Sequence, residues 1–146
     1  MAGKPTPEGK IHMANRLMTR NYMTLEKGPV ALYTRATIGA VGAPTLVPLS
    51  SKGVYNITRT GVGAYDVKFG LSATAVDTYQ RLMAAKHVVI FATSTAANMV
   101  VTADSSAVAA APKINIQFLD YAGVAVELGV GAVLCLEIIL SNSTAV

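Results

Sequence analysis

The sequence has few charged residues. They make up 14% of the 146 residues, whereas hydrophobic residues make up 52%. An ordinary globular domain carries roughly 25% charged residues, and a lone soluble monomer usually shows more charge on its surface. The chain is therefore either bound to a membrane or covered by partner chains. The most apolar stretch, residues 130–140, is interrupted by Glu137 and is shorter than the roughly 18 residues of a transmembrane helix, so partner chains are the better interpretation.

Cysteine is almost absent, and no secretory leader is visible. The single cysteine, Cys135, lies in an apolar run typical of a strand, which indicates a small core side chain rather than a reactive thiol or a metal ligand. Residues 1–10 are polar and rich in proline and glycine, and no apolar segment follows them. We therefore expect the chain to be made in a cytoplasm and to stay there at least until assembly.

The side chains that enzymes and metal sites need are also sparse. His12 and His87 have no Cys, Asp or Glu at metal-ligand spacing, and the acidic residues are scattered singly. The sequence contains no Gly-x-Ser-x-Gly motif and no Cys–His pair suited to nucleophilic catalysis. Residues 61–63, Gly-Val-Gly, lack the third glycine of a dinucleotide-binding loop and predict a hairpin turn. The sequence therefore predicts no enzyme, no cofactor and no metal.

The excess positive charge lies in the first quarter of the chain. The formal net charge is +4, yet the residues after position 36 balance six basic against six acidic side chains. Residues 1–28 are also rich in methionine, which adapts to irregular surfaces. We predict that residues 1–28 form a basic arm that docks on an acidic surface of a partner. Its predicted docking residues are Lys4, Lys10, Met13, Arg16, Leu17, Met18, Arg20, Tyr22, Leu25 and Lys27.

The sequence leaves two conformations of this arm open. Apolar side chains recur loosely every three to four positions over residues 11–26, which is compatible with a helix that Gly28-Pro29 would end. The alternative is an extended arm that orders only on a neighbouring chain. Nucleic acid is the less favoured partner, because the arm lacks a dense block of Arg and Lys and has few aromatic residues.

From Val30 onward the pattern changes to short strands separated by glycine turns. We predict strands over residues 30–38, 45–49, 54–59, 64–69, 87–91, 99–102, 113–120, 124–128 and 132–140. Pro48 favours an edge position for the second of them, and residues 77–82 are either a helical turn or a structured loop. Seven to nine such strands predict an all-β fold, with one β-sandwich or jelly-roll-like domain over residues 29–146.

Alternation predicts which side chains of these strands share a face. Residues 54–69 are predicted to form a hairpin, with Val54 on the same face as Asn56 and Thr58. In its return strand Tyr65, Val67 and Phe69 share one face, and Ile114, Ile116 and Phe118 share a face of the strand over 113–120.

The strand over residues 132–140 is apolar on both faces except at Glu137. Such a strand is either central in a sandwich or sealed by a neighbouring subunit. We predict that it packs copies of the chain together. The predicted self-association residues are Val133, Cys135, Leu136, Ile138 and Leu140.

Three segments resemble small structural proteins of tailed-bacteriophage virions. They are the hairpin GVYNITRTGVGAYDVKF over residues 53–69, the step DTYQRL over 77–82, and residues 113–143, with KINIQF, YAGVA and a long apolar strand ending in LSNS. Their order and spacing resemble phage capsid cement or decoration proteins. This resemblance implies a β-sandwich, often trimeric, that binds the outside of the capsid and bridges major capsid proteins.

We therefore expect a virion structural protein on the capsid surface that binds the major capsid protein and copies of itself, predicted to be a homotrimer, without contact with a membrane. One alternative is a head–tail, tail or fibre-base component, which would occur in rings of few copies. The other is a carbohydrate-binding β-sandwich module. It is disfavoured because the chain has no tryptophan and only 6% aromatic residues, whereas sugar-binding surfaces usually need exposed rings.

Overall fold

The computed structural model describes residues 29–90, 96 and 98–141. The predicted arm, residues 1–28, lies outside the described residues. The strands are β1 (Val30–Ile38), β2 (Pro44–Leu46), β3 (Val54–Gly61), β4 (Ala64–Ser72), β5 (Ala75–Val76), β6 (Arg81–Ile90), β7 (Asn98–Ser105), β8 (Lys113–Leu119) and β9 (Val133–Ser141). Two 3-10 turns, η1 (Ala40–Gly42) and η2 (Pro48–Ser50), flank β2.

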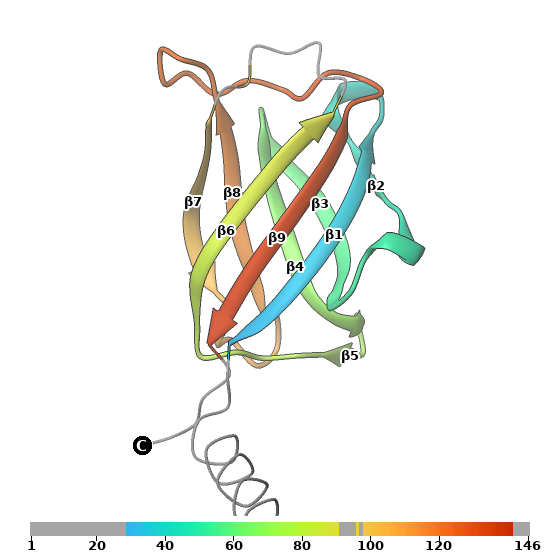
Figure 1. The fold of residues 1–146 in the computed structure, drawn as a ribbon, viewed down its shortest axis with the longest axis vertical. Coiled ribbons are helices and arrows are strands. Elements are labelled where there is room, and N and C mark those ends of the chain that lie inside the picture. The colour runs from blue at the N-terminus through green and yellow to red at the C-terminus, as the bar shows by residue number, and fades with distance from the viewer. Residues whose placement is uncertain (1–28, 91–95, 97, 142–146) are drawn as a thin grey trace, which may run out of the picture.

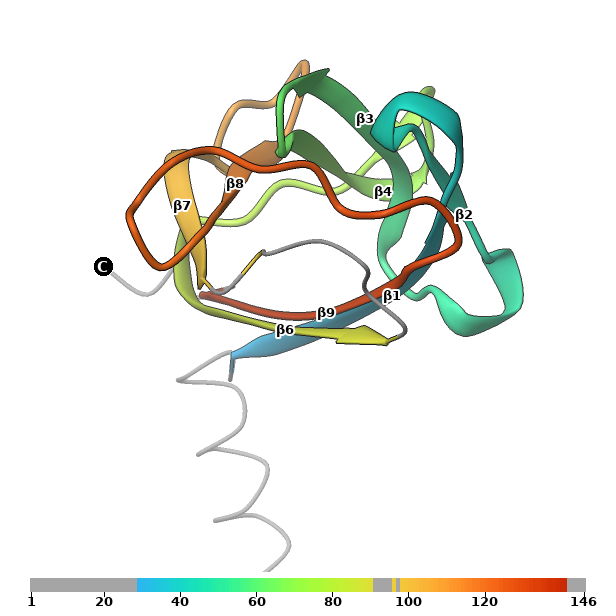
Figure 2. The ribbon, with the colours of Figure 1, turned by 90° about the horizontal axis from the view of Figure 1, so that it is seen from above.

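The strands form two antiparallel sheets that pack face to face. One sheet has the order β2-β1-β9-β6, and the other has the order β3-β4-β8-β7, with β5 paired to β4 (Figure 1). Figure 2 shows the two layers from one end, with β1, β9 and β6 in one layer and β3, β4 and β8 in the other. This architecture confirms the predicted all-β sandwich. In the part of the chain that the structure describes, no helix has the length and apolar character needed to cross a membrane.

The core lies between the two sheets and follows from period-two alternation. Every second side chain of β8 and β9 is buried, and β4 buries Tyr65, Val67 and Phe69 completely. Full burial of a large apolar side chain contributes roughly 1.5–3 kcal/mol each. The largest fully buried apolar side chains are Tyr65, Val67, Phe69, Ile38, Ile114, Ile116, Phe118, Leu128, Leu134, Ile138 and Leu140. The faces predicted for β4 and β8 are therefore confirmed.

The face prediction for β3 is wrong at its first residues. A register shift between Val54 and Asn56, opposite β4, breaks the alternation. Because a β-bulge adds a residue to one strand, Val54 and Ile57 both face the core at 4% exposure, while Asn56 is exposed. Simple alternation had placed Val54 and Asn56 together.

Of the two alternatives for residues 77–82, the structured loop holds for residues 77–80, where the amides of Tyr79 and Gln80 donate to the carbonyls of Ser106 and Ser141. Arg81 and Leu82 already belong to β6, because they pair with the end of β9.

One further segment differs from the prediction. Residues 124–128 form no strand apart from one bridge between Ala125 and Leu119. The Asp120 carboxylate accepts hydrogen bonds from the amides of Ala122 (2.8 Å) and Val124 (2.9 Å), which holds the chain in a turn instead. β2 ends its sheet, so the predicted edge position is confirmed. The predicted bounds, residues 45–49, are too long, because the strand ends at Leu46 and Pro48 lies in η2.

The β3–β4 hairpin depends on Gly63. Its φ is +60°, and an added Cβ would lie 2.1 Å from the Val126 carbonyl oxygen. We expect Gly63→Ala to lower the free energy of unfolding by about 2–3 kcal/mol, because it adds left-handed strain to a backbone clash. Chemical denaturation measures this loss. Gly61→Ala in the same hairpin is the matched control, since its Cβ would meet only Ala64 Cβ at 3.7 Å. Equal losses in the two variants would contradict this view of the hairpin.

His87 points from β6 into the sandwich, where its ring centroid lies 5.4 Å from that of Phe118. Burial lowers the pKa of His87 below its ordinary value of 6.5. The unfolded chain therefore binds this proton more readily than the folded chain does, and stability should fall as the pH drops below about 6.5. We expect His87→Leu to flatten the dependence of unfolding free energy on pH between about 7 and 5. An unchanged slope would show that another titratable group causes the pH dependence of the unfolding free energy.

Candidate functional site

The candidate site is the outer face of the sheet formed by β1, β9 and β6, which lies toward the viewer in Figure 1. The strand register sets its side chains in rows, such as Tyr33–Glu137–Lys86 and Arg35–Cys135–Val88. We call this surface the β1–β9–β6 face. Its residues are Ala31, Tyr33, Arg35, Thr37, Ala84, Lys86, Val88, Ile90, Val133, Cys135, Glu137 and Ile139.

This face is unusually apolar for a surface that lies outside the core. Val88 is 60% exposed and Tyr33 is 48% exposed. Val133, Ile139 and Ile90 are partly exposed around them. Exposed apolar patches of this kind, with charged residues among them, mark surfaces that bind other proteins.

The opposite sheet provides an internal comparison. Its outer face presents mainly polar side chains, among them Asn56, Thr58, Lys68, Asn115 and Gln117, with Val100 of β7 as an exposed apolar exception at 37%. An antiparallel sheet with one side on the core and one in water alternates in this way.

Asp66 is a nearly buried carboxylate on the outer face of the opposite sheet. Its exposure is 7%. Lys113 Nζ donates to Asp66 Oδ2 at 2.5 Å, and Asn115 Nδ2 donates to Asp66 Oδ1. A nearly buried carboxylate is tolerated only when its oxygens are paired in this way.

A shallow hollow of about 380 Å³ lies in the middle of the β1–β9–β6 face. Tyr33, Lys86, Val88, Cys135 and Glu137 surround it. Lys86 Nζ lies 3.8 Å from Glu137 Oε2. Because Lys86 is exposed, this pair contributes little to stability. Since Tyr33, Val88 and Cys135 line the hollow, it can receive an apolar side chain from another molecule. Lys86 and Glu137 at its rim provide one positive and one negative charge.

The structure divides the predicted self-association residues between two environments. Leu136, Ile138 and Leu140 point into the core of their own domain at 0–3% exposure. Val133 and Cys135 lie on the β1–β9–β6 face. Because strand side chains alternate, a neighbouring chain on this sheet would contact Val133 and Cys135 but not the three leucine and isoleucine side chains in the core.

The position of Cys135 differs from the one predicted from the sequence. It was predicted as a core side chain, but its neighbours Leu134 and Leu136 fill the core and Cys135 is partly exposed on the opposite side of β9. Sequence reasoning missed Tyr33, Val88 and Ile90 as members of this face. The available signal was β6, whose apolar side chains occur at both alternating positions.

The predicted docking residues of the arm, from Lys4 to Lys27, lie outside the described residues. At the boundary with the described chain, Pro29 is exposed and Val30 begins β1. Pro29, which follows the arm in the sequence, therefore lies at one end of the sheet that carries the β1–β9–β6 face.

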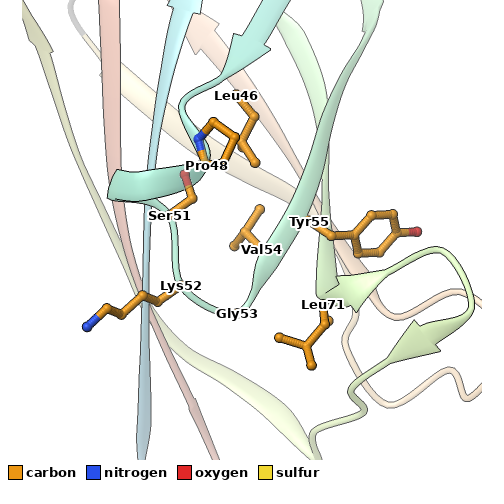
Figure 3. A pocket seen from close by; sticks show the side chains of 9 residues that line it. Leu46, Pro48, Ser51, Lys52, Gly53, Val54, Tyr55 and Leu71 are labelled. Atoms are coloured by element: carbon orange, nitrogen blue, oxygen red, sulfur yellow. The ribbon is translucent and has the colours of Figure 1, made fainter.

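A second hollow of about 390 Å³ lies beside η2 (Figure 3). Leu46, Pro48 and Val54 line one part of it, and Tyr55 and Leu71 lie on the β3 and β4 side. Leu71 is 83% exposed. Ser51 and Lys52 also line it, so the hollow combines apolar side chains with a hydroxyl and one positive charge.

Within the part of the chain that the structure describes, no three His, Cys, Asp or Glu side chains lie together as a metal site. Comparison of the chain with protein-family models, curated proteins and solved structures finds no match.

Proposed function

We propose that this chain is a structural protein of a tailed-phage virion, which decorates the capsid by binding major capsid proteins and further copies of itself. The resemblance of residues 50–143 to phage decoration proteins supports this proposal. The low charge of the chain supports it as well, since a surface covered by partners needs fewer charged residues.

The observation that carries the proposal is the difference between the two outer faces of the sandwich. The β3–β4–β8 side is polar and fully hydrogen-bonded at Asp66, whereas the β1–β9–β6 face exposes Val88 and Tyr33. Burial of such apolar surface contributes roughly 25 cal/mol per Å² removed from water. The exposed ion pairs available to the arm contribute only about 0–1 kcal/mol each. Apolar contacts should therefore determine the affinity, while the basic arm selects an acidic partner.

Deletion of residues 2–28 tests the proposal. We expect the truncated chain to lose binding to phage particles, because it lacks the basic and apolar docking residues of the arm. Its core, from β1 to β9, is retained and should give the same near-ultraviolet circular dichroism as the full chain. Cosedimentation with particles measures the binding. A folded, truncated chain that still decorates particles would contradict the role of the arm.

A further inference from the structure

We infer that copies of this chain associate edge to edge, with β6 of one copy pairing antiparallel with β7 of the next. This inference rests on the proposed function, because it names the surface through which copies bind one another. We call this surface the β6–β7 flank, which consists of β6 (Arg81–Ile90) and β7 (Asn98–Ser105). It uses only the β6 margin of the β1–β9–β6 face and leaves the rest of that face for the capsid.

Both strands of the β6–β7 flank have a free edge. Among the described strands, β6 pairs only with β9, and β7 pairs only with β8. A free edge presents unpaired backbone amides and carbonyls, which makes it a template for pairing with another chain. The regular parts available for such pairing are residues 84–90 of β6 and 98–101 of β7, because a register irregularity interrupts each strand beyond them.

The hydrophobic core is incompletely covered along this flank. Neither β6 nor β7 contains a fully buried residue, whereas β1, β8 and β9 bury alternate residues. Leu82, Val89 and Met99 pack against the core but remain partly exposed. On the opposite flank β2 contacts β3 (Figure 2), and β3 buries Val54 and Ile57. A neighbour on the β6–β7 flank would therefore cover apolar side chains of both sheets at once.

The charges of the two strands favour the pairing of unlike edges. β6 carries Arg81 and Lys86 and no acidic residue, whereas β7 carries Asp104 and no basic residue. Pairing β6 with β6 would bring two basic strands together, and like charges on facing strands are destabilising. Pairing β6 with β7 of the next copy instead brings basic side chains next to a carboxylate.

The directions of the strands allow this contact to repeat from copy to copy. The Leu82 amide donates to Asp104 Oδ2 at 2.8 Å, so the start of β6 lies beside the end of β7. The two strands run in opposite directions along the flank (Figure 1). Rotation about an axis parallel to the strands keeps these levels and directions, so it sets β6 antiparallel to β7 of the next copy and Arg81 level with that copy's Asp104. Such a contact closes into a ring when the rotation permits, as the predicted homotrimer requires.

Two exposed valines lie on the outer side of this contact. Val88 on β6 is 60% exposed, and Val100 is the apolar exception on the polar outer face, at 37% exposure. The strand register places both on the outer faces of their sheets. Counted from the level pair Leu82 and Asp104, with one irregularity in each strand, the two valines of neighbouring copies lie about two residues apart along the strands, or about 7 Å.

Cross-linking between these two positions tests the inference. Both chains carry Cys135→Ser, which removes the only cysteine. One chain also carries Val88→Cys, and a second chain, made longer by a tag, carries Val100→Cys. The two are coexpressed, purified without phage particles and treated with a short bismaleimide that bridges neighbouring strands. We expect a covalent heterodimer on a denaturing gel.

The matched control moves the second cysteine to the far edge of the same sheet. Thr58→Cys replaces Val100→Cys in the tagged chain, because Thr58 is exposed on β3, three strand spacings or about 14 Å from β7. The heterodimer yield should fall at least tenfold, and equal yields would overturn the inference.

Two further outcomes would also overturn it. Efficient cross-linking of the Val88→Cys chain to itself would show that like edges pair. A native mass of 15.2 kDa for the unaltered chain, at the concentration used for cross-linking, would show that copies do not associate. Because no particles are present, these outcomes are distinct from a failure to bind capsids.

Discussion

Val88→Glu should convert the associated protein into a monomer while leaving the domain folded. Val88 is 60% exposed in the centre of the β1–β9–β6 face, so the domain alone loses little, and surface substitutions usually change stability by less than about 0.5 kcal/mol. In the assembly the new carboxylate would be buried, and Lys86, its basic neighbour on β6, already faces Glu137. An uncompensated buried charge costs about 3–5 kcal/mol, which weakens association at least a hundredfold. Native mass spectrometry should show a shift from a multiple of 15.2 kDa to 15.2 kDa.

Gln117→Glu is the matched control for this prediction. It adds the same charge to the outer face of the opposite sheet, at a position that is also partly exposed. We expect its native mass to equal that of the unaltered chain. If both variants dissociate, net charge rather than the β1–β9–β6 face controls association. If neither variant dissociates, the interface between copies lies elsewhere on the chain.

Phe118→Ala should produce the largest loss of stability. Phe118 is completely buried between the two sheets. Its ring makes edge-to-face contacts with Tyr65, at a centroid distance of 6.0 Å, and with His87 at 5.4 Å. Removing a buried phenylalanine side chain typically costs about 3–5 kcal/mol, because it leaves a cavity as well as losing apolar burial. Chemical denaturation at neutral pH measures the loss.

The same substitution should change the titration of His87. Since burial lowers its pKa, a cavity that admits water should return the pKa toward the ordinary value, and nuclear magnetic resonance can follow this. Tyr121→Ala is the control, because Tyr121 is 94% exposed in the loop after β8. It should change neither stability nor the His87 pKa. A loss below about 1 kcal/mol in Phe118→Ala would contradict the packing described for the core.

Local sequence patterns predicted much of the sandwich correctly. β1 occupies the predicted residues 30–38, and the hairpin of β3 and β4 forms around the Gly-Val-Gly turn. Regular alternation in β4 and β8 identified the core side chains, because the period of a strand allows only one face to be buried. These features depend on residues close together in the sequence.

The differences arise where one segment depends on a distant one. The bulge near Val54 is defined only by its pairing with Phe69 and Lys68 of β4. Cys135 faces outward because Leu134 and Leu136 meet the opposite sheet, and a strand that is apolar on both sides gives no signal for which side is inward. The β1–β9–β6 face combines three strands that are separated in the sequence, so only the assembled sheet brings Tyr33, Val88 and Cys135 together.

The copy number of this chain in purified phage particles tests the central claim most directly. Quantitative mass spectrometry against the major capsid protein should give hundreds of copies per particle, alongside a free protein whose native mass is about three times 15.2 kDa. A dozen copies or fewer would place the chain in a portal, tail or fibre base. Its absence from particles would contradict the virion account and leave the β1–β9–β6 face to a partner of another kind.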